Sequence, residues 1–553
     1  MHEKRMPILI LDWARAVMFN EWEGKADVPG DGPFGGALAL TAAMYQKRQS
    51  LLLGDMSFFA EYFGERLDSV QMPVSWLTFD STQRVHLLDH PYLFTPASRV
   101  SYFRAINFSR MNRAYEEASS LQGRIEAIIK HGSLITELHH KNVLQDLLKV
   151  PSSKYLILSI GRETVLEDAF DQLWRREERE IMRPLKVHLG EDSGEEGFDS
   201  GGVQQEFFRL AIAEALNPDY GAFTVDDRTR MTWFQPGSLQ PEWKFELLGL
   251  LMSLAVYNGL TLPITFPKAF YQKLLGEPVT ELHHIADGWP DLANGLTTLL
   301  EWNERDGSVE DIFSLTYEFS ASMFGQPVSR KMQPAEPEWD NGNSNDSSDN
   351  GDEHHWPQLA GRLSAEPSPS SSNPTDAPAV TSYNRDAYVS DYIRYLTTVS
   401  VAPQFAALSR GFRRCLHPKS LTLLTPPLLQ SLVEGETAED IDVSELRRAA
   451  RYVGWDAGHR TVRDFWAVVR RYDPHMRRRL LEFVTASDRV PVGGVGNIQF
   501  VIQRNGEELG DKGHLPTAYT CYGTLLLPEY RDRDVLKERL SMALENARGF
   551  GFA

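Results

Sequence analysis

A long polar stretch divides this chain and limits the size of any single core that it can form. Residues 326–380 are dominated by Pro, Ser, Asn, Asp and Gly and contain almost no aliphatic side chains. Such a composition buries too little apolar surface to offset the entropy lost on ordering. We therefore expect a disordered insertion, either a solvated surface loop or a segment that is phosphorylated or binds a partner.

The overall charge excludes one large class of partner. The chain has 553 residues, with 57 Lys and Arg against 76 Asp and Glu, which gives a net charge of −19. That is the wrong sign for a protein whose affinity comes from neutralising phosphates, so we expect no nucleic-acid partner. At about 150 residues per domain, the length predicts three to four compact units.

Cysteine content and hydropathy limit the compartment. Two cysteines are too few for a disulfide framework or a four-thiolate zinc site, so we expect no metal and a reducing compartment, the cytoplasm or alternatively the nucleus. No run of 18 apolar residues is present, which predicts no membrane-spanning helix and no membrane partner. Residues Met6–Met18 are interrupted by Asp12 and Arg15, which favours an amphipathic helix over a signal peptide.

The region before the insertion reads as mostly helical. Val165–Met182 carries apolar residues at spacings of three and four, and Glu242–Val256 is too apolar all round to lie on a surface. Leu185–Leu189 alternates like a strand and leads through an acidic, Gly-rich loop into a helix for which Asp199 or Ser200 is a plausible N-cap.

From about Asp440 to the C-terminus the hydrophobic period changes from helical to strand-like, which predicts a compact α/β unit. Ile498–Gln503 reads as a strand followed by a turn at Asn505-Gly506. Thr524–Leu527 reads as a second strand that Pro528 ends.

One of the two cysteines has surroundings that suit chemistry. Cys415 is predicted to be a small buried hydrophobe, whereas Cys521 lies in a polar, turn-compatible segment that leads into a strand. A papain-like hydrolase needs a histidine to take the thiol proton, and none follows Cys521; His514, seven residues earlier, is the nearest and otherwise reads as a surface loop residue. An unassisted thiolate suits exchange with an activated thioester better than amide hydrolysis.

Several short motifs follow one another in a fixed order through roughly the last two-thirds of the chain, from about Leu185 to Ala553. They are G-E…G-x-D-x-G-G-V…E-F-F (Gly190–Phe208), N-P-D-Y-G-x-F (Asn217–Phe223), N-R-x-x-Y-V (Asn384–Val389), L-L-E-F-V-T (Leu480–Thr485), R-V-P-V-G-G (Arg489–Gly494), L-P-T-x-x-T-C (Leu515–Cys521), L-L-L-P-E-Y (Leu525–Tyr530) and a G-F-G-F-A tail. This ordered set resembles the HECT family of E3 ubiquitin ligases, and the residues around Pro91–Asn112 resemble the helical extension that precedes the domain in some members.

The resemblance implies an α+β fold with a bilobal HECT domain preceded by a helical N-terminal extension. The expected parts are an extension at 1–180, a mainly helical N-lobe at 181–435 that binds the ubiquitin-loaded E2, and a small α/β C-lobe at 436–553 with the catalytic cysteine. A hinge is expected at Val433–Asp440, where Gly435 and short polar residues suit a pivot.

The resemblance also implies the activity. A HECT-type E3 ubiquitin ligase accepts ubiquitin from an E2 as a thioester, here on Cys521, and transfers it to a substrate lysine. The implied partners are the ubiquitin-loaded E2, ubiquitin and protein substrates. No cofactor is implied, since ATP is used upstream by the activating enzyme.

Further site residues are carried over by position. Tyr388 occupies the place of a family Phe or Tyr that packs on the E2, and Tyr392 lies beside it; core packing is the alternative for both. Phe550 matches a tail phenylalanine associated with isopeptide formation, or packs as part of a tail. Asp199 matches an acidic position that orients or deprotonates the incoming lysine, or caps a helix. Thr520 and His514 complete the supporting candidates.

The chain departs from the family pattern around the cysteine. Members commonly read His-Thr-Cys-Phe-Asn, whereas this chain reads Tyr519-Thr520-Cys521-Tyr522-Gly523, so no general base is assigned. Gln205 also stands where a basic residue often precedes E-F-F. The departures at Tyr519 and Gly523 motivate the alternative of a catalytically weak scaffold that binds ubiquitin or an E2. A cysteine isopeptidase is disfavoured because no histidine follows the cysteine.

Overall fold

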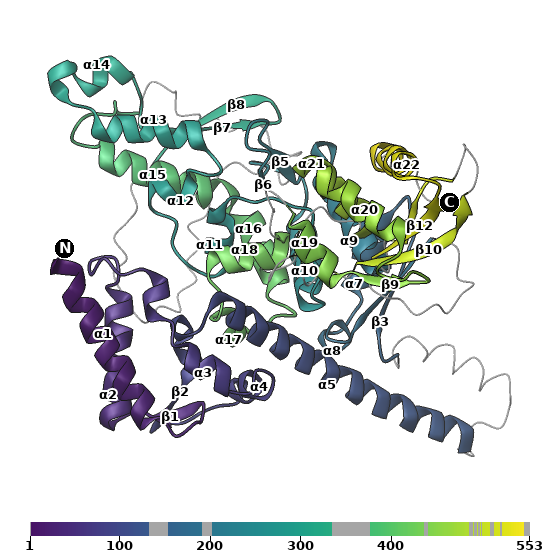
Figure 1. Ribbon diagram of the computed structural model, residues 1–553. Helices are drawn as coiled ribbons and strands as arrows, with labels where there is room; N and C mark the ends of the chain where they lie inside the picture. Colours follow the sequence, from purple (N-terminus) through teal and green to yellow (C-terminus); the bar gives the residue numbers. More distant parts are fainter. Residues whose placement is uncertain are drawn as a thin grey trace.

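The structure is a computed structural model. It describes residues 2–131, 153–190, 202–333, 377–435, 441–485, 500–508, 514–519 and 523–546, together with residues 490, 495 and 498. These residues form many helices and several small sheets, which confirms the predicted α+β class. Figure 1 shows the elements along the chain.

The N-terminal part is a helical layer that ends in one long helix. Its elements are α1 (His2–Glu21), β1 (Asp27–Pro29), α2 (Gly32–Gln46), η1 (Asp55–Phe58), α3 (Glu61–Arg66), α4 (Gln71–Leu77), β2 (Arg84–His86), η2 (Leu87–Asp89), η3 (Pro91–Leu93) and α5 (Pro96–His131). The helix predicted around Met6–Met18 is confirmed, since α1 buries Leu11, Ala14 and Met18. Arg110 of α5 ties this layer to the rest by donating to the carbonyl oxygen of Cys415 at 2.6 Å.

The largest hydrophobic cluster extends from this layer into the middle of the chain. The middle elements are β3 (Leu156–Ile160), α7 (Val165–Trp174), α8 (Glu178–Ile181), β4 (Leu185–Leu189), α9 (Gly202–Ala215), η4 (Pro218–Tyr220), β5 (Phe223–Val225), β6 (Thr232–Phe234), α10 (Glu242–Tyr257), α11 (Lys268–Leu274), α16 (Ala402–Phe412), α17 (Pro418–Leu421) and α18 (Pro426–Glu434). Helix α10 is buried along most of its length, as its uniform hydrophobicity predicted.

Helices α10 and α16 cross at very short range because each presents a glycine to the other. A Cβ built on Gly249 would collide with the carbonyl oxygen of Leu408, and one built on Gly411 would collide with the carbonyl oxygen of Glu246. The close crossing therefore requires hydrogen in place of a side chain at both positions.

One predicted helix is two helices. Val165–Met182 was expected to be continuous, but α7 ends at Trp174 and α8 begins at Glu178. Glu177 starts the second helix with a capping box, in which its side chain accepts from the main chain while Glu180 accepts from the N–H of Glu177 at 3.0 Å. The local cap outweighs the continuous apolar spacing.

A second group of elements flanks the polar insertion and has its own hydrophobic cluster. It comprises α12 (Leu282–Ile285), α13 (Pro290–Glu301), η5 (Glu304–Asp306), α14 (Val309–Phe313), β7 (Glu318–Met323), β8 (Gln326–Lys331), α15 (Arg385–Thr397) and η8 (Val399–Val401). The predicted start of the insertion at residue 326 is wrong, since Gln326–Lys331 pairs with β7 as an antiparallel hairpin. Val380, at its predicted end, is fully buried. Residues 334–376 lie outside the described part.

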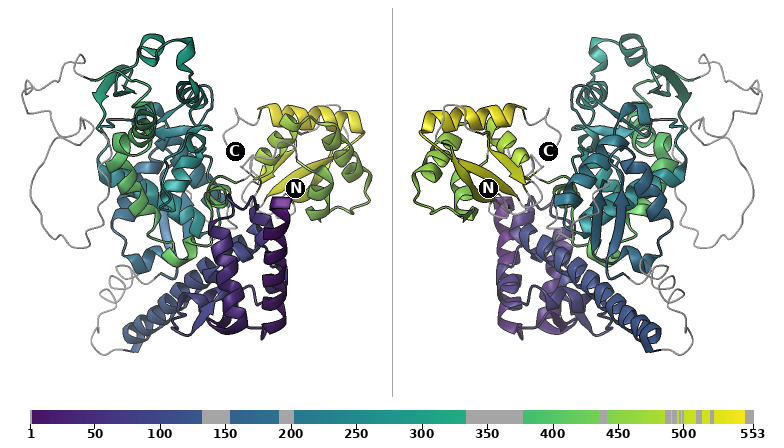
Figure 2. Two further views of the ribbon diagram at one scale, coloured as in Figure 1. Left: turned by 90° about the vertical axis from the view of Figure 1, so that its left-hand side faces the viewer. Right: turned by 90° about the vertical axis from the view of Figure 1, so that its right-hand side faces the viewer.

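The C-terminal elements enclose a separate cluster of buried side chains that runs from Ile441 to Leu544. They are α19 (Val443–Ala449), β9 (Arg451–Val453), α20 (Arg460–Arg471), α21 (Pro474–Thr485), β10 (Val501–Glu508), β11 (Thr517–Tyr519), β12 (Thr524–Tyr530) and α22 (Arg533–Asn546). The sheet order is β11-β12-β10-β9, and β10 pairs parallel with both of its neighbours. Figure 2 shows these elements, in light green and yellow, as a body beside the teal and green helices.

Two predictions about this sheet are wrong for one shared reason. Strand β10 continues past Asn505 and Gly506, and β12 continues past Pro528 to Tyr530. The parallel register pairs Arg504 with Leu527 and then Glu507 with Glu529, so Asn505-Gly506 faces Pro528 across an irregularity. The missing N–H of the proline falls where no ladder bond is made.

Candidate functional site

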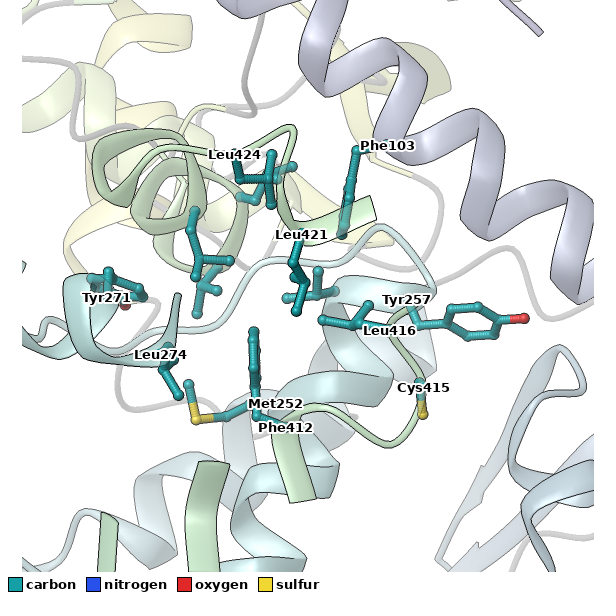
Figure 3. Packing of buried hydrophobic residues seen from close by; sticks show 14 of the residues in the cluster. Phe103, Met252, Tyr257, Tyr271, Leu274, Phe412, Cys415, Leu416, Leu421 and Leu424 are labelled. Carbon is teal, nitrogen blue, oxygen red and sulfur yellow. The ribbon is translucent and has the colours of Figure 1, made fainter. Parts of the chain in front are cut away.

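Cys415 is part of the packed interior. Its side chain is fully buried between α16 and α17, and its main-chain N–H donates to Ser253 at 3.1 Å. Burial raises the pKa of the Cys415 thiol to about 12. Figure 3 shows Cys415 near Leu416 and Tyr257 of the large cluster. The prediction of a buried hydrophobic residue is therefore confirmed, and a reactive thiolate is excluded at this position.

A thiol reagent should distinguish the two cysteines. We expect iodoacetamide at pH 7.5 to label Cys521 in the native protein and to react with Cys415 roughly a thousand-fold more slowly, because a pKa of about 12 leaves almost no thiolate. Mass spectrometry of the digested protein measures both sites, and a denatured sample is the control in which both are labelled. Fast native labelling of Cys415 would contradict the buried position.

Two strands that pair with each other, β11 and β12, flank Cys521 in the sequence. Tyr519, the last residue of β11, pairs with Thr524, the first residue of β12. Thr520, Cys521 and Tyr522 fall between these paired residues in sequence and lie outside the described part of the chain. We call the connection between Tyr519 and Thr524 the cysteine loop. The antiparallel pairing holds both of its ends at one end of the sheet, where β10 also begins.

Gly523 closes this loop with a conformation that most residues avoid. Its φ is 54°, in the left-handed region, and its carbonyl oxygen accepts from the N–H of Val501 at 2.8 Å. Glycine adopts this region without cost, and asparagine is among the residues that tolerate it best. Gly523 stands where the family that the sequence resembles commonly has asparagine, and both residues can adopt the left-handed φ that the backbone has here.

Substitutions of Gly523 should follow backbone preference rather than size. We expect Gly523→Asn to keep most of the C-terminal unit's stability, whereas Gly523→Val, of similar volume, should cost about 2 kcal/mol or more because a β-branched residue is strained at this φ. Chemical denaturation of both variants measures the difference. Equal stability of the two would show that the left-handed conformation is not required.

His514 precedes β11 and is held through its backbone. Its side chain is exposed, and its carbonyl oxygen accepts from the hydroxyl of Tyr530 at 2.5 Å. Tyr530 therefore connects the end of β12 to the segment that leads into β11, a contact that the sequence did not reveal, although Tyr530 belongs to a recognised motif. A chemical role for the His514 ring stays a prediction. Asp199 and Phe550 lie outside the described residues.

The two E2-binding candidates pack against aromatic neighbours. Tyr388 is 4% exposed, and its ring centroid lies 5.6 Å from that of Tyr317 and 5.7 Å from that of Tyr392. Tyr392 is half-buried, 5.1 Å from Phe319 between ring centroids. This geometry fits the packing alternative for Tyr388, while a contact with an E2 stays a prediction. The same group of elements exposes a tyrosine that sequence reasoning missed, Tyr383, at 98%.

The predicted hinge is only partly described. Helix α18 ends at Glu434, Gly435 follows with a φ of 73°, and residues 436–440 lie outside the described part. Val433 and Glu434 are buried in the body before the hinge. The first residues of the predicted hinge are therefore fixed to the preceding helices.

The described residues contain no group of three or more His, Cys, Asp or Glu side chains placed to hold a metal ion. Among the helices that the structure describes, none has the length and apolarity needed to cross a bilayer.

Comparisons with known proteins identify the family. The chain is 28% identical over 509 residues to mouse "Probable E3 ubiquitin-protein ligase HECTD2". The aligned region covers 89% of this chain and 57% of that protein. It is 30% identical over 429 residues to human "Probable E3 ubiquitin-protein ligase HERC4", covering 77% of this chain and 36% of that protein. With "Probable E3 ubiquitin-protein ligase HUL4" of Eremothecium gossypii the identity is 30% over 411 residues, covering 72% and 43%.

The chain thus spans little more than half the length of the HECTD2 proteins that it matches, and less of the others. A family model described as HECT-domain (ubiquitin-transferase) matches residues 209–553, which contain the cysteine loop and the strands that hold it. The predicted resemblance is confirmed, and the chain belongs to the HECT-domain (ubiquitin-transferase) family.

Proposed function

We propose that this chain is a HECT-type E3 ubiquitin ligase that carries ubiquitin as a thioester on Cys521. The observation that carries the proposal is the contrast between the two cysteines of the chain. Cys415 is buried with a strongly raised thiol pKa, whereas Cys521 falls between two paired strands inside the matched domain. Only the second position suits a nucleophile that must meet another protein.

The proposed reaction has two steps. The Cys521 thiolate attacks the thioester carbonyl that joins ubiquitin to the E2 cysteine, and the E2 thiolate leaves. A substrate lysine amine then attacks the new thioester; the carbon–sulfur bond breaks as the isopeptide bond forms, the amine loses one proton to solvent, and Cys521 leaves as a thiolate. The partners in this proposal are the loaded E2, ubiquitin and a protein substrate.

The proposed division of labour follows the sequence. Residues 1–180 form an extension, 181–435 an E2-binding N-lobe and 436–553 a C-lobe that carries the thioester. The cluster that starts at Ile441 supports the last boundary, since its members all come from the C-terminal unit. A cytoplasmic or nuclear location also stays a proposal.

The test is formation of a ubiquitin adduct. Incubation with ubiquitin, the activating enzyme, ATP and a panel of E2 enzymes should give a ubiquitin-linked band that disappears with reductant. Absence of such a band with every E2 would refute the proposal and favour a scaffold that binds without transfer. The presence of Gly523 was one reason to consider a scaffold without transfer activity. That reason is weakened, because the left-handed φ at this position suits glycine.

A further inference from the structure

The body before the predicted hinge ends in a buried acid. Val433 is the last member of the large hydrophobic cluster, and Ile441 is the first member of the C-terminal one. Between them, Glu434 is the final residue of α18 and is only 3% exposed. A glutamate is rarely buried this completely unless its carboxylate is well partnered.

The Glu434 carboxylate connects three separate segments. Its Oε1 accepts from the main-chain N–H of Phe266 at 2.8 Å and from the hydroxyl of Tyr271 at 2.7 Å. Its Oε2 lies 3.4 Å from the side-chain amide of Gln430, one turn earlier in α18. The last turn of α18 is thereby tied both to α11 and to the loop before it.

The main chain reinforces the same junction. The carbonyl oxygen of Val433 accepts from the N–H of Leu262 at 2.7 Å, and the N–H of Gly435 donates to the carbonyl oxygen of Ser431 at 3.0 Å. Gly435 then leaves the helix with a φ of 73° and a ψ of 171°. Gly435 thus sets the direction in which the chain leaves toward the C-terminal unit. Glu434, just before it, cannot move without breaking buried hydrogen bonds.

We propose that Glu434 is a positioning residue for ubiquitin transfer, whose buried carboxylate fixes the point at which the chain pivots between the two lobes. When Glu434 is held in place, the C-terminal unit can rotate only about Gly435. This single pivot limits the positions that Cys521 can reach. Without Glu434, the last turn of α18 frays and the pivot moves upstream, so fewer encounters place Cys521 next to the E2 thioester. The inference rests on the proposed transferase function.

The test compares Glu434→Gln with Glu167→Gln, which alters an exposed glutamate on α7 that has no described role in transfer. Glu434→Gln keeps the shape but adds amide hydrogens where Oε2 faces the donor group of Gln430. We expect single-turnover transfer of ubiquitin from the E2 to Cys521 to slow about tenfold in Glu434→Gln and to stay within about twofold of wild type in the control.

A second readout separates positioning from a general loss of structure. A ubiquitin probe with an electrophilic C-terminus reacts with Cys521 without an E2, and its rate should change by less than about twofold, since the loop chemistry is untouched. Tyr271→Phe removes one donor only and should slow E2-dependent transfer about threefold, so it carries the test if Glu434→Gln fails to fold.

The outcomes are distinct. Slower E2-dependent transfer with an unchanged probe rate supports the positioning role. Unchanged transfer in both variants, or an equal fall in the two rates, overturns it while leaving the transferase function intact. Absence of any thioester in wild type overturns the transferase function and the positioning role together.

Discussion

Replacing Cys521 by alanine should abolish ubiquitin transfer. Alanine offers no atom to hold the thioester, so we expect the reductant-sensitive adduct to vanish and substrate ubiquitination to fall by a factor on the order of 10³ or more. The measurement is a non-reducing gel of a single-turnover reaction with a preloaded E2. Replacing Cys415 by serine is the matched control and should leave the adduct in place, although loss of a buried apolar thiol lowers stability.

Cys521→Ser makes the same test in a positive form. A serine hydroxyl at this position should take ubiquitin slowly as an oxygen ester, which resists thiol reductants but not alkali. Wild type and Cys521→Ala supporting equal transfer would contradict the proposal and point to a scaffold. An adduct that forms in Cys521→Ala and resists reductant would instead point to ubiquitin attached to a lysine through an isopeptide bond.

Gly249→Ala should destabilise the body that holds α10 and α16. The added methyl group would lie 2.0 Å from the Leu408 carbonyl oxygen, and neither helix backbone can shift without separating the pair. We expect a loss of about 3 kcal/mol or more, which for a unit of this size lowers the Tm by roughly 5–10 °C. Differential scanning calorimetry measures the shift.

Gly295→Ala is the matched control. Gly295 also lies inside a helix, α13, but a Cβ there meets nothing within 4 Å. Alanine should therefore be neutral or stabilising by up to about 1 kcal/mol. If both variants lost the same stability, the close crossing of α10 and α16 could not be the cause of the loss in Gly249→Ala.

Features with a local or one-dimensional signal could be predicted from the sequence. Helix α10 has no polar face, and that alone indicates burial. The predicted strand Leu185–Leu189 matches β4 because alternation of apolar residues is a property of the strand itself. The choice of Cys521 over Cys415 followed from neighbouring residue types, and burial of Cys415 supports it.

Features that depend on a distant partner could not be predicted. Pro528 was expected to end a strand, but the irregularity at Asn505-Gly506 in another strand accommodates it. Gln326–Lys331 looks like the polar insertion, and only its pairing with β7 makes it a strand. The sequence around Glu434 does not predict that this carboxylate, beside a hinge, accepts hydrogen bonds from Phe266 and Tyr271, which lie more than 160 residues away.

The order of the C-terminal sheet has a consequence for the timing of synthesis. The central strand β10 is flanked by β9, made earlier, and by β12, made later. Both ends of the cysteine loop are held through β12, so a nascent chain still attached to the ribosome short of Tyr530 lacks the complete strand that anchors those ends. A prematurely terminated polypeptide would then contain Cys521 but not the strand that pairs on either side of it, so the proposed transfer would require translation through β12.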